Sequence, residues 1–109
     1  MNVSFEDFKK LDLRIARILK VEDHPNADKL YLVTLDLRGQ EKTLVAGIRQ
    51  HYQKEDLVGK LVVVVNNLEP AVIRGVESSG MILAASDNDK KHIIVLTPDK
   101  PIETGSKVS

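Results

Sequence analysis

The sequence predicts an all-β domain, a small five-stranded Greek-key barrel with a short helix between its third and fourth strands. Two observations carry most of this prediction. Apolar residues alternate with polar ones along 11–21 and 31–37, which is typical of strands with one buried face. The run LVVVV (61–65) is uninterrupted and rich in β-branched residues, which indicates a strand buried on both faces.

The first three strands are expected from these alternating runs and from one further apolar segment. In the first strand, the alternate positions that are apolar are Leu11, Leu13, Ile15, Leu19 and Val21, and Arg17 is the one exception among them. In the second strand it comprises Tyr31, Val33, Leu35 and Leu37. After a short link around Gly39, the segment TLVAGI (43–48) provides the third strand.

The second half of the chain is expected to begin with a helix and continue with strands. QHYQKEDLVGK (50–60) is polar, lacks a β-branched cluster and closes at a glycine, which predicts one or two helical turns. LVVVV, MILAA (81–85) and HIIVL (92–96) are the following strand candidates. SDNDKK (86–91) has the composition of a turn between the last two.

Both ends of the chain are expected to form short extensions. FEDFKKL (5–11) spaces its apolar residues three apart, which predicts an amphipathic turn docked on the barrel. The tail TPDKPIETGSKV (97–108) has two prolines and one glycine and is expected to be irregular. Three strands, a short helix and further strands match the order of an oligonucleotide/oligosaccharide-binding (OB) barrel. Residues 1–109 are therefore expected to form a single domain.

The composition limits the kinds of partner that this chain can have. Lys plus Arg equals Asp plus Glu, 16 each, so a nucleic acid would have to be held by a local cluster of cations. The chain has no cysteine, and its longest apolar run is too short to cross a bilayer. No leader of basic, apolar and small residues opens the sequence, so we expect a cytoplasmic location without a membrane partner.

The turn HPNADK (24–29) carries more polar groups than chain reversal requires. Pro25 restricts its own φ, while Asn26 and Asp28 can hydrogen-bond the backbone of the turn. A solvated hairpin turn explains these residues but does not explain Lys29, because a turn needs no ammonium group. Two interpretations remain open at this point, chain reversal alone or chain reversal that also presents a cation.

The sequence offers no pattern that is typical of catalysis or metal binding. His24, His51 and His92 lack the spacing of metal ligands, and DNDK (87–90) lacks the glycine and the closing glutamate of a calcium loop. The serines of GVESSGM (75–81) lack the flanking glycines of a nucleophile elbow. We therefore expect no catalytic residue, no metal ion and no cofactor.

The segment NNLEPAVIRGVESSGM (66–81) mixes polar and apolar residues. It has too little alternation for a strand, and Pro70 argues against a continuous helix. Arg74 lies within its apolar part, where two interpretations apply. The arginine either pairs with Glu69 or Glu77, or it holds a phosphate, for which its forked guanidinium is well shaped.

Four ordered blocks of the sequence resemble the tRNA-binding domain family: DLRIA (12–16), HPNADKL (24–30), VAGI (45–48) and NLEP…RGVESSGM (67–81). Members of this family are appended to the C-terminus of methionyl-tRNA synthetases, stand alone as dimers, or serve as cytokine-like auxiliary proteins of multi-synthetase complexes. The resemblance extends from about Phe5 to Val108 and implies an OB barrel that usually forms a homodimer. A related family of export chaperones shares the fold and the length but lacks HPNADKL.

The resemblance also implies a tRNA-binding face near the first turn and the loop before the fifth strand. Carried over to the matching positions, the tRNA-binding residues are Asn26, Lys29, Asn67, Arg74, Ser78 and Met81, with Arg49 added because it follows VAGI directly. The sequence departs from many family members in lacking a basic extension, so its few cations would have to suffice.

The function that follows is general tRNA binding by a non-catalytic module. It would be the C-terminal, dimerising domain of a methionyl-tRNA synthetase or its stand-alone equivalent, with tRNA, a second copy and the synthetase's catalytic part as partners. Two phenylalanines and two tyrosines are too few for a base-stacking groove, which favours recognition of RNA shape and backbone. The alternative is an export-chaperone-like or assembly module that binds peptides or protein partners on the same barrel face.

Overall fold

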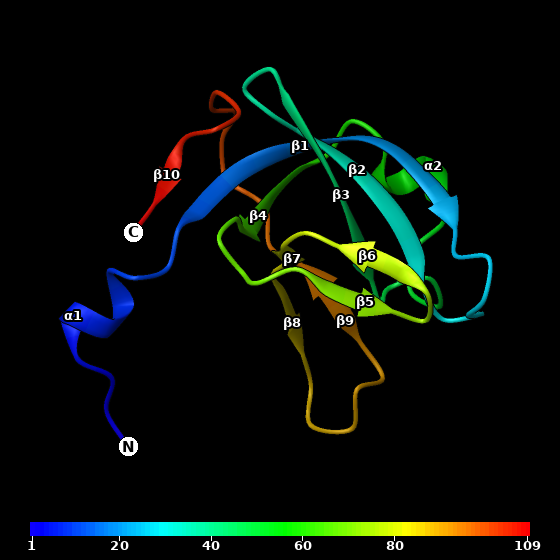
Figure 1. Cartoon of the computed structure of the whole chain (residues 1–109), viewed down its shortest axis with the longest axis horizontal. Coiled ribbons are helices and arrows are strands. Elements are labelled where there is room, and N and C mark those ends of the chain that lie inside the picture. Colours follow the sequence, from blue (N-terminus) through cyan, green and yellow to red (C-terminus); the bar gives the residue numbers. More distant parts are fainter.

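The computed structural model describes residues 1–109 and has the all-β architecture expected from the sequence (Figure 1). Its elements are α1 (Phe5–Phe8), β1 (Leu13–Asp23), β2 (Tyr31–Leu37), β3 (Gln40–Ala46), α2 (Lys54–Leu57), β4 (Leu61–Val65), β5 (Ala71–Ile73), β6 (Val76–Ser78), β7 (Met81–Ile82), β8 (Ala84–Ser86), β9 (Ile93–Val95) and β10 (Lys107–Val108). The main sheet has the order β3-β2-β1-β4-β7, with β10 added beside β1. A three-stranded meander whose fourth strand returns next to the first is a Greek key, as predicted.

The patterns of β2 and β4 are confirmed residue by residue. Tyr31, Val33, Leu35 and Leu37 of β2 are all buried, and the residues between them are half-buried. In β4, Val62 through Val65 are all buried, so this strand is covered on both faces. The helix also forms where it was expected, because α2 lies within 50–60 and places Leu57 in the core. These elements therefore define the core of the curled sheet.

β1 departs from strict alternation because it contains a β-bulge. Ile18 is paired with Leu35 and Lys20 with Thr34, so Leu19 is an extra residue with no partner in β2. Leu19 is 42% exposed, and the prediction that it shares the buried face of β1 is wrong. Leu11 lies before the strand begins and is exposed as well.

The curled sheet closes into a barrel where β3 meets the connection between β6 and β7. The Ser79 amide donates to the Thr43 carbonyl (3.3 Å), and the Val45 amide donates to the Ser78 hydroxyl (2.9 Å). Gly80 then passes so close to β4 that an added Cβ would lie 2.9 Å from the Val65 carbonyl oxygen. The seam thus depends on a few hydrogen bonds and on a residue without a side chain.

Three expectations about the connecting segments are corrected by the structure. Residues 71–78 form a β-hairpin, β5–β6, although this segment was expected to be too irregular for a strand. MILAA is interrupted at Leu83 and contributes to both β7 and β8. The C-terminal tail is irregular except for β10, which pairs with the start of β1.

The expectation that α1 docks on the barrel is wrong. No residue of α1 is buried, Phe5 is 70% exposed, and the helix stands away from the barrel in Figure 1. Ser4 caps the helix by accepting a hydrogen bond from the Asp7 amide, so local capping rather than packing defines it. Neither helix approaches the length needed to span a membrane.

Candidate nucleic-acid interface

The tip of the β5–β6 hairpin is a tight turn formed by Arg74 and Gly75. Ile73 pairs with Val76, and both turn residues have positive φ, 53° for Arg74 and 88° for Gly75. Positive φ at both central residues is the signature of a type I′ turn, in which Asn, Asp or Gly usually fills the first position. An arginine there adopts a left-handed conformation that side chains with a Cβ disfavour, so its surroundings must hold it.

The β1–β2 loop supplies that support through His24, which is only 3% exposed. Its Nδ1 accepts a hydrogen bond from the Asn26 amide (3.0 Å), so the neutral ring carries its proton on Nε2. Nε2 then donates to the carbonyl of Ile73 (3.0 Å). His24 therefore joins the loop to β5 from the inside, with both ring nitrogens engaged in hydrogen bonds.

Asn26 makes the second connection between the loop and the turn. Its Nδ2 donates to the Arg74 carbonyl (2.9 Å), and Arg74 Nη2 donates to the Asn26 carbonyl at a longer 3.4 Å. Gly75 leaves room for this contact, since a Cβ there would lie 3.4 Å from Asn26 Nδ2. We call residues 24–30 together with Arg74 and Gly75 the loop–turn corner.

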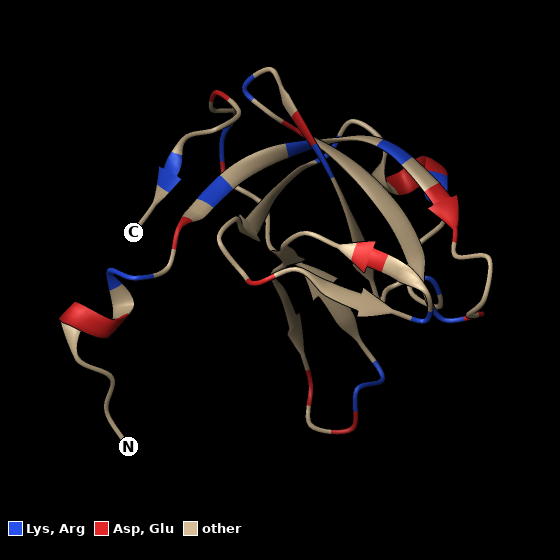
Figure 2. Cartoon of the chain, in the orientation of Figure 1, with Lys and Arg blue, Asp and Glu red and all other residues tan.

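Lys29 and Arg74 come together at this corner, 45 positions apart in sequence. Both line one shallow hollow of about 350 Å³ with Ala27, Asp28 and Leu30. Arg74 pairs with neither Glu69 nor Glu77, so the ion-pair interpretation of this arginine is wrong; the pairs near the corner are Arg49–Asp23 and Lys54–Asp23. Figure 2 shows Lys and Arg positions gathered where the β1–β2 loop meets the β5–β6 turn.

Arg49 braces the loop from the barrel side. Its Nη1 donates to the Ala27 carbonyl (3.2 Å), and its own backbone amide donates to the Lys29 carbonyl (3.4 Å). Its Nη2 lies 3.4 Å from Asp23, and the side chain is 28% exposed. Because the guanidinium is engaged on two sides, Arg49 holds the backbone of Lys29 in place and offers less of its own charge to a ligand.

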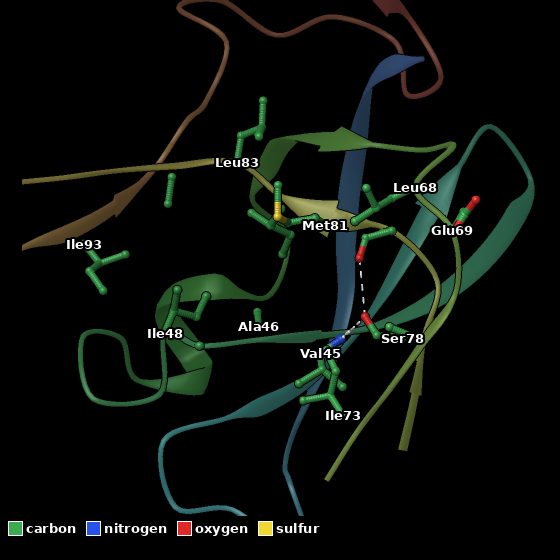
Figure 3. Close-up of a pocket in the computed structure, with 15 residues that line it drawn as sticks. Val45, Ala46, Ile48, Leu68, Glu69, Ile73, Ser78, Met81, Leu83 and Ile93 are labelled. Carbon is green, nitrogen blue, oxygen red and sulfur yellow. Dashed lines mark hydrogen bonds between the residues drawn. The ribbon is translucent and has the colours of Figure 1, made fainter. Parts of the chain in front are cut away.

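Met81 borders an open apolar groove beside the corner. The groove has a volume of about 390 Å³, and most of its lining is hydrophobic. Its principal side chains are Val45, Ile48, Leu68, Ile73, Met81 and Leu83, shown in Figure 3. Met81 is 43% exposed, so a ligand in the groove would contact it directly.

Ser78 and Asn67 lie outside the loop–turn corner, although Ser78 also lines the apolar groove. Ser78 is 4% exposed; its hydroxyl accepts from the Val45 amide and donates to the Gly80 carbonyl (3.3 Å), both dashed in Figure 3. Asn67 accepts from the Asp12 amide (2.9 Å) and donates to the Lys10 carbonyl (2.7 Å). The first closes the barrel seam and the second fixes the start of β1, so neither belongs to the loop–turn corner.

The start of β1 is held by a polar cluster of its own. Asn66 Nδ2 donates to Asp12 Oδ2 (2.9 Å), and Arg14 Nε donates to Asp12 Oδ1 (2.6 Å). The hydrogen bond from Asn66 lowers the pKa of Asp12 below its ordinary value of 3.8. Burial acts in the opposite direction, and the hydrogen bond and positive charge of Arg14 lower the pKa further. This cluster stabilises the charged carboxylate and anchors the chain beside β4.

Sequence reasoning missed the structural role of His24 and most of the groove. The H-x-N spacing is a usable signal, because a histidine Nδ1 can accept from the amide two residues later, as it does here. Nothing local marks Ile48 or Leu68 as groove residues, since the groove forms only when β3 meets the β4–β5 loop and β7.

Comparison with known proteins identifies the family. The family model described as "Putative tRNA binding domain" matches residues 13–107. Proteins named "Methionine--tRNA ligase" from Nanoarchaeum equitans and Pyrococcus furiosus are 55% and 56% identical over 106 residues, 97% of this chain. The chain spans only 13% and 14% of those two relatives.

Solved structures of similar size share the fold along the whole chain. The MetRS related protein from Pyrococcus horikoshii has a TM-score of 0.93 at 28% identity, covering 100% of this chain and 99% of that one. The chaperone CsaA from Bacillus anthracis has a TM-score of 0.89 at 29% identity, covering 100% of both chains.

Proposed function

Because this chain belongs to the tRNA-binding domain family, we propose that it binds folded tRNA through the loop–turn corner, with Lys29 and Arg74 as its phosphate contacts. The observation that carries the proposal is the convergence of these two cations in one hollow, where neither forms an ion pair with a carboxylate. A forked guanidinium and an ammonium group suit phosphate oxygens. On a chain with no net charge, such local clustering is what an RNA ligand requires.

The remaining residues have supporting roles in this proposal. Asn26 and His24 fix the loop against the turn, and Arg49 holds the backbone beneath Lys29. A stiff loop loses less conformational entropy on binding than a mobile one, which increases the affinity available from few charges. Met81 extends the contact area along the groove, while Ser78 and Asn67 contribute by holding the strands that frame it.

Recognition by these groups is expected to be general across tRNAs. Phosphate contacts position a protein on RNA but carry no base sequence. Tyr31 is buried, with its hydroxyl bound to the Tyr52 carbonyl (2.7 Å), and the Tyr52 hydroxyl accepts from the Val95 amide, so neither ring offers a stacking platform. Phe5 is exposed, but α1 stands away from the loop–turn corner in Figure 1. Shape and backbone therefore account for binding at the corner better than base stacking does.

We further propose that residues 1–109 form a module of a methionyl-tRNA synthetase or its stand-alone counterpart, acting in the cytoplasm. The high identity to methionine–tRNA ligases over a small part of their length supports the first form. The MetRS related protein of matching length supports the second. The chain itself is the non-catalytic, tRNA-binding part, and aminoacylation would belong to another segment.

A homodimer is part of the same proposal. The N-terminal segment leaves Val3, Phe5 and Leu11 exposed, and Ile94 and Leu96 are exposed on another part of the surface. Large exposed apolar side chains are typical of surfaces that another protein covers. Sedimentation equilibrium over a range of concentrations measures the mass directly, and a strictly monomeric mass would contradict this part.

A titration of the chain with unfractionated tRNA, followed by gel shift, tests the central proposal. Saturable binding that weakens as salt is raised is expected. Lys29→Ala should reduce it, whereas Lys100→Ala in the C-terminal tail, in a separate hollow with Arg17, is the matched control. Absence of binding at low salt would favour the alternative, a module that binds proteins. The Bacillus anthracis neighbour is named a chaperone, which is the reason to include that outcome.

A further inference from the structure

We infer that the apolar groove receives one unstacked nucleobase of the bound RNA, whose flanking phosphate lies against Lys29 and Arg74. The inference rests on the proposed function and adds a second recognised feature, an unpaired nucleotide, to the phosphate contacts. It concerns the groove bordered by Ile48, Leu68 and Met81, which the phosphate contacts leave unused.

The chemistry of the groove selects an apolar ligand with a flat body. Val45, Ile48 and Leu68 present aliphatic surface, and Met81 adds a polarizable sulfur that makes favourable contacts with aromatic rings. A phosphate or ribose placed there would lose its hydration without gaining hydrogen-bond donors. A nucleobase has apolar faces for these walls, and its polar edge can remain toward solvent in an open groove.

The groove and the cationic hollow are separate cavities that lie next to each other, because residues lining one are neighbours of residues lining the other. Ile73 lines the groove and accepts the hydrogen bond of His24 through its carbonyl, while its neighbour Arg74 lines the hollow. On the other side, Leu30 lines the hollow, and its Cδ2 would lie 3.7 Å from a Cβ added to Gly47 in the groove. A base in the groove and its phosphate in the hollow would therefore be adjacent parts of one RNA segment.

The charge beside the groove favours RNA over a peptide. Lys29 and Arg74 line the neighbouring hollow together with one carboxylate, Asp28, and neither cation is paired with it. Glu69 is the carboxylate that lines the groove itself. An apolar peptide would gain nothing from the cations, whereas a nucleotide uses both features. Bases inside an RNA helix are stacked and cannot enter, so the groove would select RNA with splayed-out loop nucleotides.

The two methionines of the chain allow a direct test by NMR of protein labelled with ¹³C at the methionine methyl groups. Met81 borders the groove, while Met1 is fully exposed at the terminus and serves as the internal reference. On saturation with unfractionated tRNA, the Met81 methyl signal should move upfield through the ring current of the base. The Met1 signal should stay, and a fully paired RNA duplex should move neither.

A groove-filling variant provides the affinity measurement. Ala71 lines the groove and is exposed on β5, so Ala71→Leu occupies the space without burying a new polar group. tRNA binding should weaken about tenfold, with duplex binding and the melting temperature unchanged.

An unmoved Met81 signal on a chain that binds tRNA, or unchanged tRNA affinity of Ala71→Leu, would overturn the inference and leave the proposed function standing. A parent chain that binds no tRNA would remove the proposed function, and the inference with it. The same variant can be tested against an unfolded apolar polypeptide. If Ala71→Leu loses binding to that polypeptide but keeps its tRNA affinity, the groove binds peptides, and the inference is overturned as well.

Discussion

Asn26 and Arg74 are 48 residues apart in sequence and exchange two hydrogen bonds, one from each side chain to the other's backbone carbonyl. Each residue thereby fixes the backbone of the element that carries the other. The loop that presents Lys29 and the turn that presents Arg74 consequently move as one body. Arg74 contributes both to the positive charge of the corner and to its rigidity. A useful substitution must therefore change the charge while keeping the backbone of the corner in place.

Arg74→Asn largely separates the two effects, because it keeps the 2.9 Å hydrogen bond from Asn26 to the backbone carbonyl of residue 74 and loses only the longer 3.4 Å bond together with the charge. Asparagine favours the left-handed conformation that Arg74 holds at φ 53°, so the turn should be as stable as in the parent or slightly more stable. The variant removes a cation from the hollow, and we expect tRNA affinity to fall about tenfold, the loss expected for one charged hydrogen bond. Thermal denaturation and a tRNA gel shift measure the two quantities.

Arg38→Asn is the matched control. Arg38 and Gly39 form a second turn with both φ positive, 60° and 88°, between β2 and β3. This turn lies away from the β5–β6 tip in Figure 1, and Arg38 lines a hollow with Asp36 and Glu103. We expect its tRNA affinity to match the parent's. Equal losses in the two variants would mean that overall charge, and not the loop–turn corner, determines binding.

Lys29→Ala should change the salt dependence as well as the affinity. Each phosphate contact contributes about −0.7 to −0.9 to the slope of log affinity against log salt. Removing the ammonium group should therefore make the slope shallower by about one contact, while the melting temperature stays the same because Lys29 is exposed and forms no ion pair. A parallel shift of the line without a change of slope would exclude a phosphate contact by Lys29.

His24→Ala should lower the stability of the fold and loosen the corner together. The substitution removes both hydrogen bonds of the buried ring and leaves the Ile73 carbonyl and the Asn26 amide without these partners. Because both groups are only partly buried, we expect a cost at the lower end of about 1–3 kcal/mol. tRNA affinity should also fall, although both cations remain. Urea denaturation and hydrogen exchange at the Asn26 amide report the two effects.

His92→Ala is the comparison for His24→Ala. His92 bonds Asp87 at 2.6 Å in the exposed loop between β8 and β9, and surface changes of this kind are usually within about 0.5 kcal/mol of the parent. If His24→Ala is no less stable than His92→Ala, the hydrogen bonds that join loop and turn contribute little.

Features that depend on local sequence patterns were predicted well, whereas features that depend on contacts between distant segments were not. The alternation of β2 and the valine run of β4 depend on burial that the sequence pattern itself records, and both were confirmed. The bulge at Leu19 depends on the register with β2, which no residue of β1 encodes. Burial pattern is a local signal, whereas register is set by the partner strand.

The site divides in the same way. HPNADKL predicted a turn, which lies between β1 and β2, and Lys29 and Arg74 line one hollow. Their contact with tRNA stays a prediction. The hairpin that presents Arg74 was missed because its turn is Arg-Gly, outside the usual Asn-Gly and Asp-Gly signals. Ser78 carries a hydroxyl that the sequence could not distinguish from a surface group, since only the closed seam buries it.

Asp12→Asn tests the polar cluster at the start of β1 through its pH dependence. Because the pKa of Asp12 is lowered in the folded chain, its contribution to the free energy of unfolding is present above the ordinary value of 3.8 and declines as pH falls through the folded pKa. The parent should therefore be more stable than the variant at about pH 6, with the difference shrinking toward about pH 2.

The pKa of Asp87 is lowered as well, through its hydrogen bonds with His92, and both proteins retain that carboxylate. Only the difference between parent and Asp12→Asn therefore reports on Asp12. Urea denaturation at a series of pH values gives this difference. A difference that stays constant with pH would mean that the carboxylate is no more stable in the folded chain than in the unfolded one.

Gly80→Ala tests the barrel seam, and Gly39→Ala is its control. Both glycines have positive φ, 115° and 88°, so alanine introduces backbone strain at each position. At Gly39 nothing lies within 4 Å of the added Cβ, whereas at Gly80 the Cβ would meet the Val65 carbonyl oxygen at 2.9 Å. Gly80→Ala should therefore melt at a lower temperature than Gly39→Ala, by about 4–8 °C for each additional kcal/mol. The backbone of β4 cannot move away from the added methyl group without breaking its pairing with β1. Equal melting temperatures would therefore mean that β6 and β7 move instead, and that the seam does not hold them in a fixed position.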